Sequence, residues 1–182
     1  MADTPERPAT GDAVRDAADQ RAHDYVQATE IGQAIPWVWD LITGELQHGP
    51  GRERLLGYGP GELSGKLDNW IELSHPDDQY AVRVALEAHL RGEAPYYDVE
   101  YRQRHRDGHW VWVRSRGQVV KRSPNSGKPL RMLGTAVDIT PERNALERVR
   151  QMNQDLVSLF STLPDAVVHV DAQGRWKFAN IA

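Results

Sequence analysis

Three long segments between residues 96 and 140 alternate apolar and polar side chains, and this alternation constrains the fold more than any other feature of the chain. They read YYDVEYRQRH (96–105), HWVWVRSRGQVVKR (109–122) and LRMLGTAVDIT (130–140). A period of two is typical of β-strands with one buried face. Asp107-Gly108 between the first two segments suits a two-residue type I′ turn. The pattern therefore predicts an antiparallel meander of three strands.

The preceding part of the chain predicts two more strands and several helices. IPWVWDLITGELQHGPG (35–51) contains two strand-like runs around a turn at Thr43-Gly44. RERLLGY (52–58) and GPGEL (59–63) read as short helical turns punctuated by glycine. A longer helix is expected to begin near Asp77 or Asp78 and to end at Gly92. The element order predicts an α+β fold, with a five-stranded antiparallel sheet and helices on one face.

Both ends of the chain differ in character from this central part. Residues 1–12 are rich in Pro, Thr, Asp and Ala, a composition that predicts disorder, and 13–31 has apolar residues at helical spacing. A charged helix is expected over 141–163, and 164–182 reads as a strand, a turn at 172–174 and a second strand. Two strands alone cannot bury a face, so we expect the chain to be a piece of a longer protein.

Four motifs carry a family resemblance. LLGYGPGEL, HPDD, EYRQRHRDGHWVWVRSRG and GTAVDIT occur in an order, over residues 33–140, that resembles a PAS domain of the type with a C-terminal PAC segment. LFSTLPDAVVHVDAQGRWKFAN resembles the start of a second PAS domain. The resemblance implies a sensory or dimerisation module of a bacterial multidomain signalling protein. Its output domain, a histidine kinase or a cyclic-di-GMP enzyme, would lie outside this chain.

The helix expected over 141–163 has a narrow apolar seam. Thr140 is a suitable N-cap, and Pro141 suits the first helical position. Spacings of 3, 4, 3, 4 and 3 are those of a heptad seam, in which one Asn favours a two-stranded parallel pairing. We therefore predict a homodimer through the helices flanking the domain, the alternative being a plain surface linker. The seam consists of Leu146, Val149, Asn153, Leu156, Phe160 and Leu163.

The resemblance also implies where a signal would leave the domain. Asp138, Ile139 and Thr140 match a motif that resembles a latch between the sheet and the following helix. In PAS–PAC proteins the Asp of this motif pairs with a basic residue of the sheet. Asp138 is the corresponding candidate here, with Arg102, Arg114 or Arg116 as its possible partner.

The chain has no cysteine, which excludes thiolate metal sites, and its seven histidines are the residues that suggest a metal or haem site. A two-residue turn would place His105 opposite Trp110 and Arg106 opposite His109, so no metal site is predicted there. His89 is late on the long helix, which in haem-binding PAS domains faces the cofactor, and this makes it a candidate for haem. Cysteine-based flavin photochemistry is excluded, whereas non-covalent flavin stays open. The sequence requires no cofactor.

Tryptophans are concentrated in the predicted domain. Their simplest interpretation is core packing, or a sheet face that another helix covers. The alternative is an aromatic-lined pocket for a small-molecule ligand between the sheet and the helices. The residues concerned are Trp37, Trp39, Trp70, Trp110 and Trp112.

Composition limits the remaining classes of function. A formal net charge of −4 argues against a nucleic-acid partner, and the chain has no apolar run long enough for a membrane segment and no secretory signal. A cytoplasmic location fits these features. No nucleophile–base set or phosphate-binding glycine loop occurs, so no catalytic role is predicted for this chain.

Overall fold

The protein was examined as a computed structural model, which describes residues 20, 24, 27–29, 31–49, 51–63, 65–162 and 168–179. The chain divides into two units, Met1–Ile139 and Thr140–Ala182. Of the expected helix over 13–31, the few described positions from 20 to 31 are helical. The rest of that helix, and the expected disorder over 1–12, lie outside the described residues.

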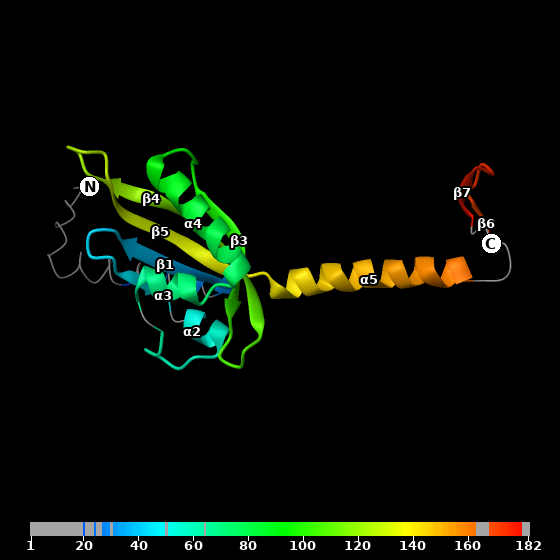
Figure 1. The fold of residues 1–182 in the computed structure, drawn as a ribbon, viewed down its shortest axis with the longest axis horizontal. Coiled ribbons are helices and arrows are strands. Elements are labelled where there is room, and N and C mark those ends of the chain that lie inside the picture. Colours follow the sequence, from blue (N-terminus) through cyan, green and yellow to red (C-terminus); the bar gives the residue numbers. More distant parts are fainter. Residues whose placement is uncertain are drawn as a thin grey trace, which may run out of the picture. The chain divides into compact units, whose positions relative to one another are not determined.

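A five-stranded antiparallel sheet forms the centre of the first unit, as the alternating pattern predicted (Figure 1). The strand order β2-β1-β5-β4-β3 places the first strand beside the last, so the two ends of the domain meet in the middle of the sheet. The strands are β1 (Ala34–Asp40), β2 (Leu46–His48), β3 (Tyr97–Arg104), β4 (Trp110–Arg122) and β5 (Pro129–Asp138).

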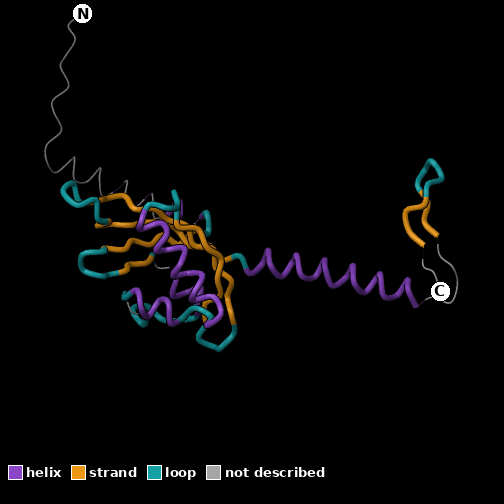
Figure 2. Tube along the Cα trace, turned by 45° about the horizontal axis from the view of Figure 1, so that its top comes forward, coloured by secondary structure: helices purple, strands orange, loops and turns teal. Residues whose placement is uncertain are grey.

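Three helices pack on one face of this sheet (Figures 1 and 2). They are α2 (Gly51–Leu56), α3 (Leu67–Glu72) and α4 (Pro76–Arg91). The limits of α4 agree with the prediction, because Pro76 occupies its first turn and Gly92 ends it at φ 82°. His75 is the N-cap, and its Nδ1 accepts the backbone N–H of Asp77 at 3.2 Å. The short helix α3 was not predicted as a separate element.

The hydrophobic core fills the space between the sheet and these helices. Leu56, Val82 and Met132 are fully buried within it, and each comes from a different element. Large aromatic side chains supply much of the remaining volume. The cluster comprises Trp37, Leu46, Leu56, Trp70, Ile71, Val82, Leu86, Tyr97, Tyr101, Val111, Val113 and Met132.

The loop of the hairpin between β3 and β4 is longer than predicted. Arg104 pairs with Trp110, and the His105 N–H donates to the His109 carbonyl at 2.9 Å, so the loop has three residues rather than two. Gly108 adopts φ 91° and donates to the His105 carbonyl, which is a type I turn followed by a left-handed residue. This register places the two histidines opposite each other, contrary to the sequence-based expectation.

The second unit contains α5 (Thr140–Thr162) and a hairpin of β6 (Val168–Val170) and β7 (Trp176–Ala179). Only Ile139 separates β5 from α5, so the strand does continue into a long helix without a loop. The hairpin has its turn where it was predicted, with Gly174 at φ 76°. None of the helices described in either unit is both long and apolar enough to cross a membrane.

Candidate functional site: an interior cavity with a buried arginine

A small cavity of about 30 Å³ lies inside the domain, between the sheet and the helices. Its lining is mostly apolar and comes from all five strands and from α2, α3 and α4. The sequence-based alternative of an aromatic-lined pocket thus has a physical counterpart, because Trp37, Trp39 and Trp70 all line this cavity. The other two tryptophans of that group, Trp110 and Trp112, do not line it.

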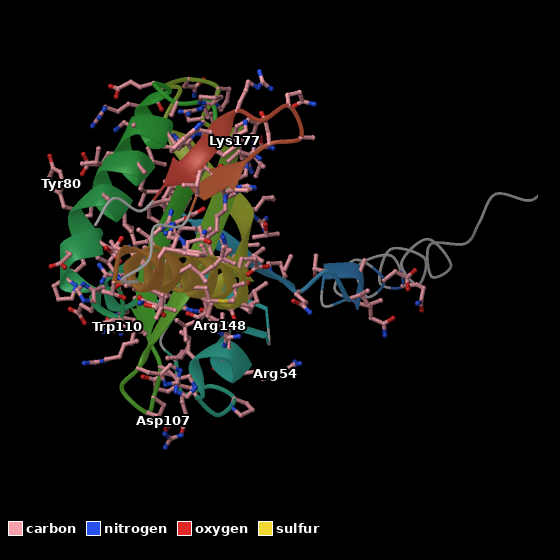
Figure 3. The ribbon with its side chains drawn as sticks, turned by 90° about the vertical axis from the view of Figure 1, so that its right-hand side faces the viewer. Arg54, Tyr80, Asp107, Trp110, Arg148 and Lys177 are labelled. Carbon is pink, nitrogen blue, oxygen red and sulfur yellow. The ribbon has the colours of Figure 1, made fainter. Side chains whose placement is uncertain are left out.

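Trp110 and Trp112 make contacts outside the cavity. Trp110 is 37% exposed and packs its ring against His75, with centroids 4.5 Å apart (Figure 3). The guanidinium of Arg102 lies 5.3 Å from the ring centroid of Trp112, in a cation–π contact. Both side chains alternate with the buried Val111 on β4, so they belong to the opposite face of the sheet.

One arginine is buried in the wall of the cavity. Arg52 on α2 is only 5% exposed, and its Nη1 lies 2.9 Å from both ring nitrogens of His48 on β2. Burial lowers the pKa of Arg52 to about 10, which leaves the guanidinium charged at neutral pH. Burial and the Arg52 charge together lower the pKa of His48 to about 3, so His48 is neutral and accepts the hydrogen bond. A buried arginine normally pairs with a carboxylate.

No carboxylate pairs with Arg52 among the residues that the structure describes. Glu53, its neighbour on α2, instead accepts the backbone N–H of Gly61 at 2.8 Å. The Nε of Arg52 is buried and has no hydrogen-bond partner in the described part of the protein. Glu53 still attracts the Arg52 charge through space, but this attraction is weaker than the effect of burial, which lowers the pKa of Arg52.

Four other buried polar groups around the cavity also lack a hydrogen-bond partner in the described part of the protein. Within the described residues, the indole Nε1 atoms of Trp37 and Trp39, the hydroxyl of Tyr97 and the Nε2 of Gln103 have no hydrogen-bond partner. All four side chains line the cavity. An unsatisfied buried polar group costs about 1–3 kcal/mol in folding free energy. Such a concentration in one place indicates a site that a ligand or water completes.

A second, larger hollow adjoins this site from outside. Its volume is about 260 Å³, and its lining includes Leu46, His48 and Arg52, which also line the interior cavity. These three side chains therefore stand between the inner cavity and the outer hollow. The sequence patterns did not indicate Arg52 as a site residue. The one available signal was its position four residues before Leu56, on the same face of a short helix.

His89 was the sequence-based candidate for a haem ligand. It is 5% exposed, and its Nε2 accepts the backbone N–H of Val119 at 2.9 Å. Its Nδ1 lies 2.9 Å from the Ala94 carbonyl and so donates to it. Both nitrogens are engaged in joining α4 to β4 and to the loop after α4. An iron atom could bind this side chain only after one of these hydrogen bonds broke.

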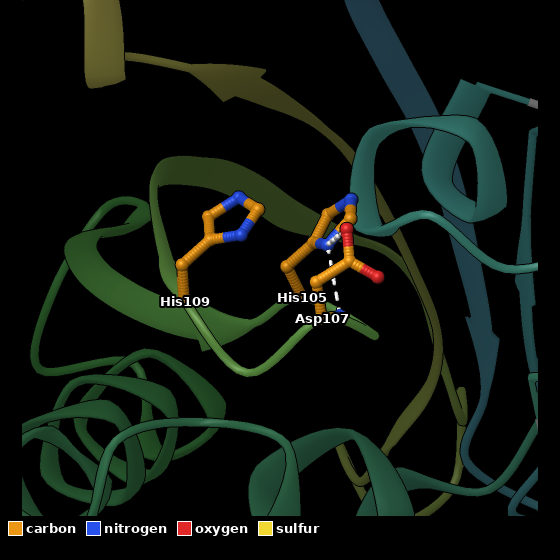
Figure 4. A group of neighbouring side chains, drawn as sticks. All are labelled: His105, Asp107 and His109. Atoms are coloured by element: carbon orange, nitrogen blue, oxygen red, sulfur yellow. Dashed lines mark hydrogen bonds and ion pairs between the residues drawn. The ribbon is translucent and has the colours of Figure 1, made fainter.

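The tip of the β3–β4 hairpin gathers His105, Asp107 and His109 (Figure 4). Their potential ligand atoms lie within 4.8 Å of one another, and the two imidazole rings stack with centroids 4.1 Å apart. The Asp107 N–H donates to His105 Nδ1 at 3.1 Å. A Cβ on Gly57 would overlap the His105 ring, so this ring packs directly on the turn after α2. These contacts give His105 a role in docking the hairpin.

A family model described as the PAS fold matches residues 46–136, which is half of the chain. This chain belongs to the PAS family. The matched region contains the three helices that cover the cavity, strands β2, β3 and β4, and β5 up to residue 136, and it includes all residues that line the cavity except Ile35, Trp37 and Trp39 of β1. The resemblance of the central part of the sequence to a PAS domain is thereby confirmed, whereas a second PAS domain after it remains a prediction.

Solved structures of PAS domains from signalling proteins resemble this one. A sensory box histidine kinase/response regulator from Burkholderia thailandensis is 34% identical with a TM-score of 0.61, and the match covers 74% of this chain and 98% of that one. The N-terminal domain of a diguanylate cyclase with a PAS/PAC sensor, from Marinobacter aquaeolei, is 34% identical with a TM-score of 0.53. That match covers 60% of this chain and 98% of the other.

Curated relatives are longer proteins. The sensor protein FixL of Bradyrhizobium diazoefficiens is 25% identical over 138 residues, which are 76% of this chain and 26% of FixL. The chain spans between 14% and 26% of the length of the curated relatives reported for it. The shared region corresponds to a sensory module and not to a whole signalling protein.

Haem and flavin do not fit this PAS domain as it stands. The interior cavity of about 30 Å³ holds only a few heavy atoms, whereas both cofactors are far larger. In addition, both His89 nitrogens are already engaged, as described above.

The three arginines predicted as partners of Asp138 all have other contacts. Arg102 makes a bidentate pair with Asp78, and Arg114 makes one with Asp98. Arg116 lies 4.5 Å from the ring centroid of Tyr96. Asp138 itself pairs with Val113 in the sheet register. The latch that involves Asp138, Ile139 and Thr140 remains a prediction.

The predicted seam of α5 is exposed in its described part. Leu146, Val149, Leu156 and Phe160 are between 39% and 55% exposed. The same helix also exposes Met152, Val157 and Leu159. Leu163, the last member of the predicted seam, lies outside the described residues. No residue of α5 is buried within its described part, and exposed apolar side chains of this kind are typical of association surfaces. The pairing of two copies along this seam remains a prediction.

Proposed function

We propose that this chain is a regulatory PAS module that dimerises through α5 and passes a ligand- or partner-induced signal along that helix to an output domain. Similar domains occur in a histidine kinase/response regulator and in a diguanylate cyclase, which makes either enzyme class a candidate for the output. The module itself senses and transmits, and the enzymatic activity belongs to the output domain.

The observation that carries this proposal is the connection between β5 and α5. β5 lies in the middle of the sheet, between β1 and β4, and Ile139 alone separates its end from the start of α5. The Ile139 N–H donates to the Trp112 carbonyl at 2.9 Å, so the strand pairing holds up to the last residue before the helix. A displacement of β5 within the sheet would therefore act on the start of α5 through a connection of one residue.

Dimerisation supplies the second half of the mechanism. Most of the stability of a protein helix comes from packing of its apolar face, and α5 exposes its apolar side chains. Pairing two copies along Leu146, Val149, Asn153 and Leu156 would bury these side chains in a parallel coiled coil. Rotation or tilt of one helix then changes its register against the other, which the next domain can detect.

The hairpin after α5 supports a further PAS domain in the parent protein. In β6–β7, Asp171 Oδ1 accepts the backbone N–H groups of Gln173 and Arg175. In β1–β2, Asp40 Oδ1 likewise accepts two turn N–H groups, from Ile42 and Thr43. This shared turn chemistry fits the expectation that residues 164–182 open a second PAS domain.

Disulfide trapping tests the dimer directly, because the natural chain has no cysteine. A single Val149→Cys substitution places a thiol on the predicted seam, and Arg148→Cys places one at the neighbouring heptad position, which is off the seam. Figure 3 labels Arg148. In a parallel dimer the Val149→Cys protein forms a disulfide-linked dimer on mild oxidation, and the Arg148→Cys protein does not. Equal cross-linking of both variants, or of neither, would overturn the proposed pairing.

A further inference from the structure

The interior cavity combines a buried cation with several buried hydrogen-bond donors that lack acceptors. Arg52, Tyr97 and Gln103 are 5%, 1% and 2% exposed, and each has a polar atom without a partner in the described part of the domain. The indole nitrogens of Trp37 and Trp39 add two more donors. All five residues line one cavity, although they come from β1, α2 and β3. The side chains that carry these donors and the positive charge thus surround one small cavity.

The ligand that complements this volume must accept hydrogen bonds and carry negative charge. A carboxylate has two oxygens with about four acceptor positions, and it can take two parallel hydrogen bonds from a guanidinium. Apolar side chains such as Leu55, Val113 and Met132 line the rest of the cavity and suit a hydrocarbon group. We propose that this cavity binds a small monocarboxylate, with the Arg52 guanidinium as its counter-charge.

The size of the cavity limits this ligand. A buried water needs roughly 10–15 Å³ of the same kind of volume. Because about 30 Å³ is two to three times this volume, the cavity accommodates about two to three heavy atoms, so formate fits and acetate, with one more heavy atom, requires a small adjustment of the lining side chains. Larger carboxylates would require movement of the surrounding helices.

The outer hollow provides a route by which a ligand reaches Arg52, and it favours ligands that carry a single negative charge. Arg52 and His48 line both the outer hollow and the inner cavity, so an anion in the hollow can reach the guanidinium. Glu45 and Glu53 also line the hollow. Their negative charges repel di- and tricarboxylates more strongly than a monocarboxylate. That this ligand is the signal which the domain senses rests on the proposed function, whereas the binding itself does not.

Nuclear magnetic resonance of the indole N–H groups provides the test on the unaltered chain. Sodium acetate, sodium chloride and the neutral isostere acetamide are each titrated at matched ionic strength. The Trp37 and Trp39 signals are assigned with Trp37→Phe and Trp39→Phe. We expect saturable shifts of these two signals with acetate alone. Absence of such shifts, or equal shifts with acetamide or chloride, would show that water or an unselective occupant fills the cavity and would overturn the proposal.

Two arginines of α2 form a matched pair of variants. Arg52→Met is expected to weaken acetate binding about tenfold to a hundredfold, because a charge-assisted hydrogen bond is lost. Arg54→Met, two residues away at the exposed surface, should leave binding unchanged (Figure 3). Undiminished binding by a folded Arg52→Met protein would overturn the proposal, and if this variant fails to fold, the comparison of acetate with acetamide decides. Acetate binding by a protein whose α5 does not pair would contradict only the proposed function.

Discussion

Trp37 on β1 contacts Tyr97 on β3, although β5 and β4 lie between these two strands. The ring centroids are 6.2 Å apart and the rings are nearly perpendicular at 79°. The contact is possible because Gly134 and Gly117 occupy the two intervening positions of the same register row. The Trp37 indole crosses both glycines to reach Tyr97. One wall of the interior cavity therefore depends on two residues that have no side chain.

Substitution of Gly117 by alanine should destabilise the domain. A Cβ at this position would overlap the six-membered ring of Trp37 and lie 2.8 Å from the Leu133 carbonyl oxygen. Overpacking of this kind costs about 1–3 kcal/mol in the free energy of unfolding. Urea denaturation followed by circular dichroism measures the loss. Gly59→Ala is the control, because a Cβ there meets only ordinary contacts with Glu62, and a similar loss in both variants would contradict the explanation.

Much of the fold could be predicted because its signals are local. The two-residue alternation from 96 to 140 identified three strands, and Pro76 and Gly92 marked the ends of the longest helix of the domain. The type of the β3–β4 turn was wrong because Asp-Gly occurs in both two- and three-residue hairpin loops. A register change of one residue then decides whether His105 faces His109 or Trp110.

The cavity was less accessible to prediction because burial depends on contacts between distant segments. In GRERLLGY, Arg52 and Arg54 look equivalent, yet only Arg52 is turned into the domain. The short helix α3 has six residues and an N-cap, Lys66, whose side chain makes no capping hydrogen bond. It therefore carries neither helical periodicity nor a start signal. The sequence did indicate an aromatic pocket as an alternative, although only Trp37, Trp39 and Trp70 of that group contribute to it.

Removal of the Asp78 charge should weaken the attachment of α4 to the sheet. Its carboxylate accepts the Nε, Nη2 and backbone N–H of Arg102 at 2.8, 2.7 and 2.9 Å. These hydrogen bonds hold the pKa of Asp78 below its usual 3.8, so their contribution is present above that pH and is lost as the pH falls through the lowered value. Asp78→Asn should cost about 1.5–3 kcal/mol at pH 7.

The free energy of unfolding at low pH shows whether the loss in Asp78→Asn comes from the missing charge or from the amide substitution in general. Asp78→Asn should lose less stability than the natural protein when the pH is lowered below 3.8. The control is Asp77→Asn, because the neighbouring Asp77 is 77% exposed and 3.8 Å from Arg102. Urea titrations at a series of pH values give both comparisons. An unchanged acid limb in Asp78→Asn would contradict the assigned pair.

His48 should make the domain sensitive to mild acid. Its pKa falls from 6.5 to about 3 on folding, through burial and the neighbouring Arg52 charge, so the unfolded chain binds the proton more readily. Stability contributed by neutral His48 is therefore complete above 6.5 and declines as the pH falls toward 3. Between pH 7 and pH 5 the loss is up to about 2 kcal/mol. His48→Gln should flatten the curve in this window, which urea titrations at a series of pH values measure. An equally steep curve in His48→Gln would contradict the assignment.

Replacement of Asn153 by leucine should strengthen the association of α5 while it weakens the choice of register. Asn153 is the one polar member of the predicted seam, and an asparagine at such a position favours a single parallel, two-stranded arrangement at some loss of stability. Analytical ultracentrifugation should therefore detect a tighter dimer, or a mixture with higher oligomers, in Asn153→Leu. Gln154→Leu adds the same side chain one position off the seam and should leave the association constant unchanged. If Asn153→Leu and Gln154→Leu associate equally, the apolar surface of α5 and not its heptad seam drives pairing, and the helix could not transmit a defined rotation.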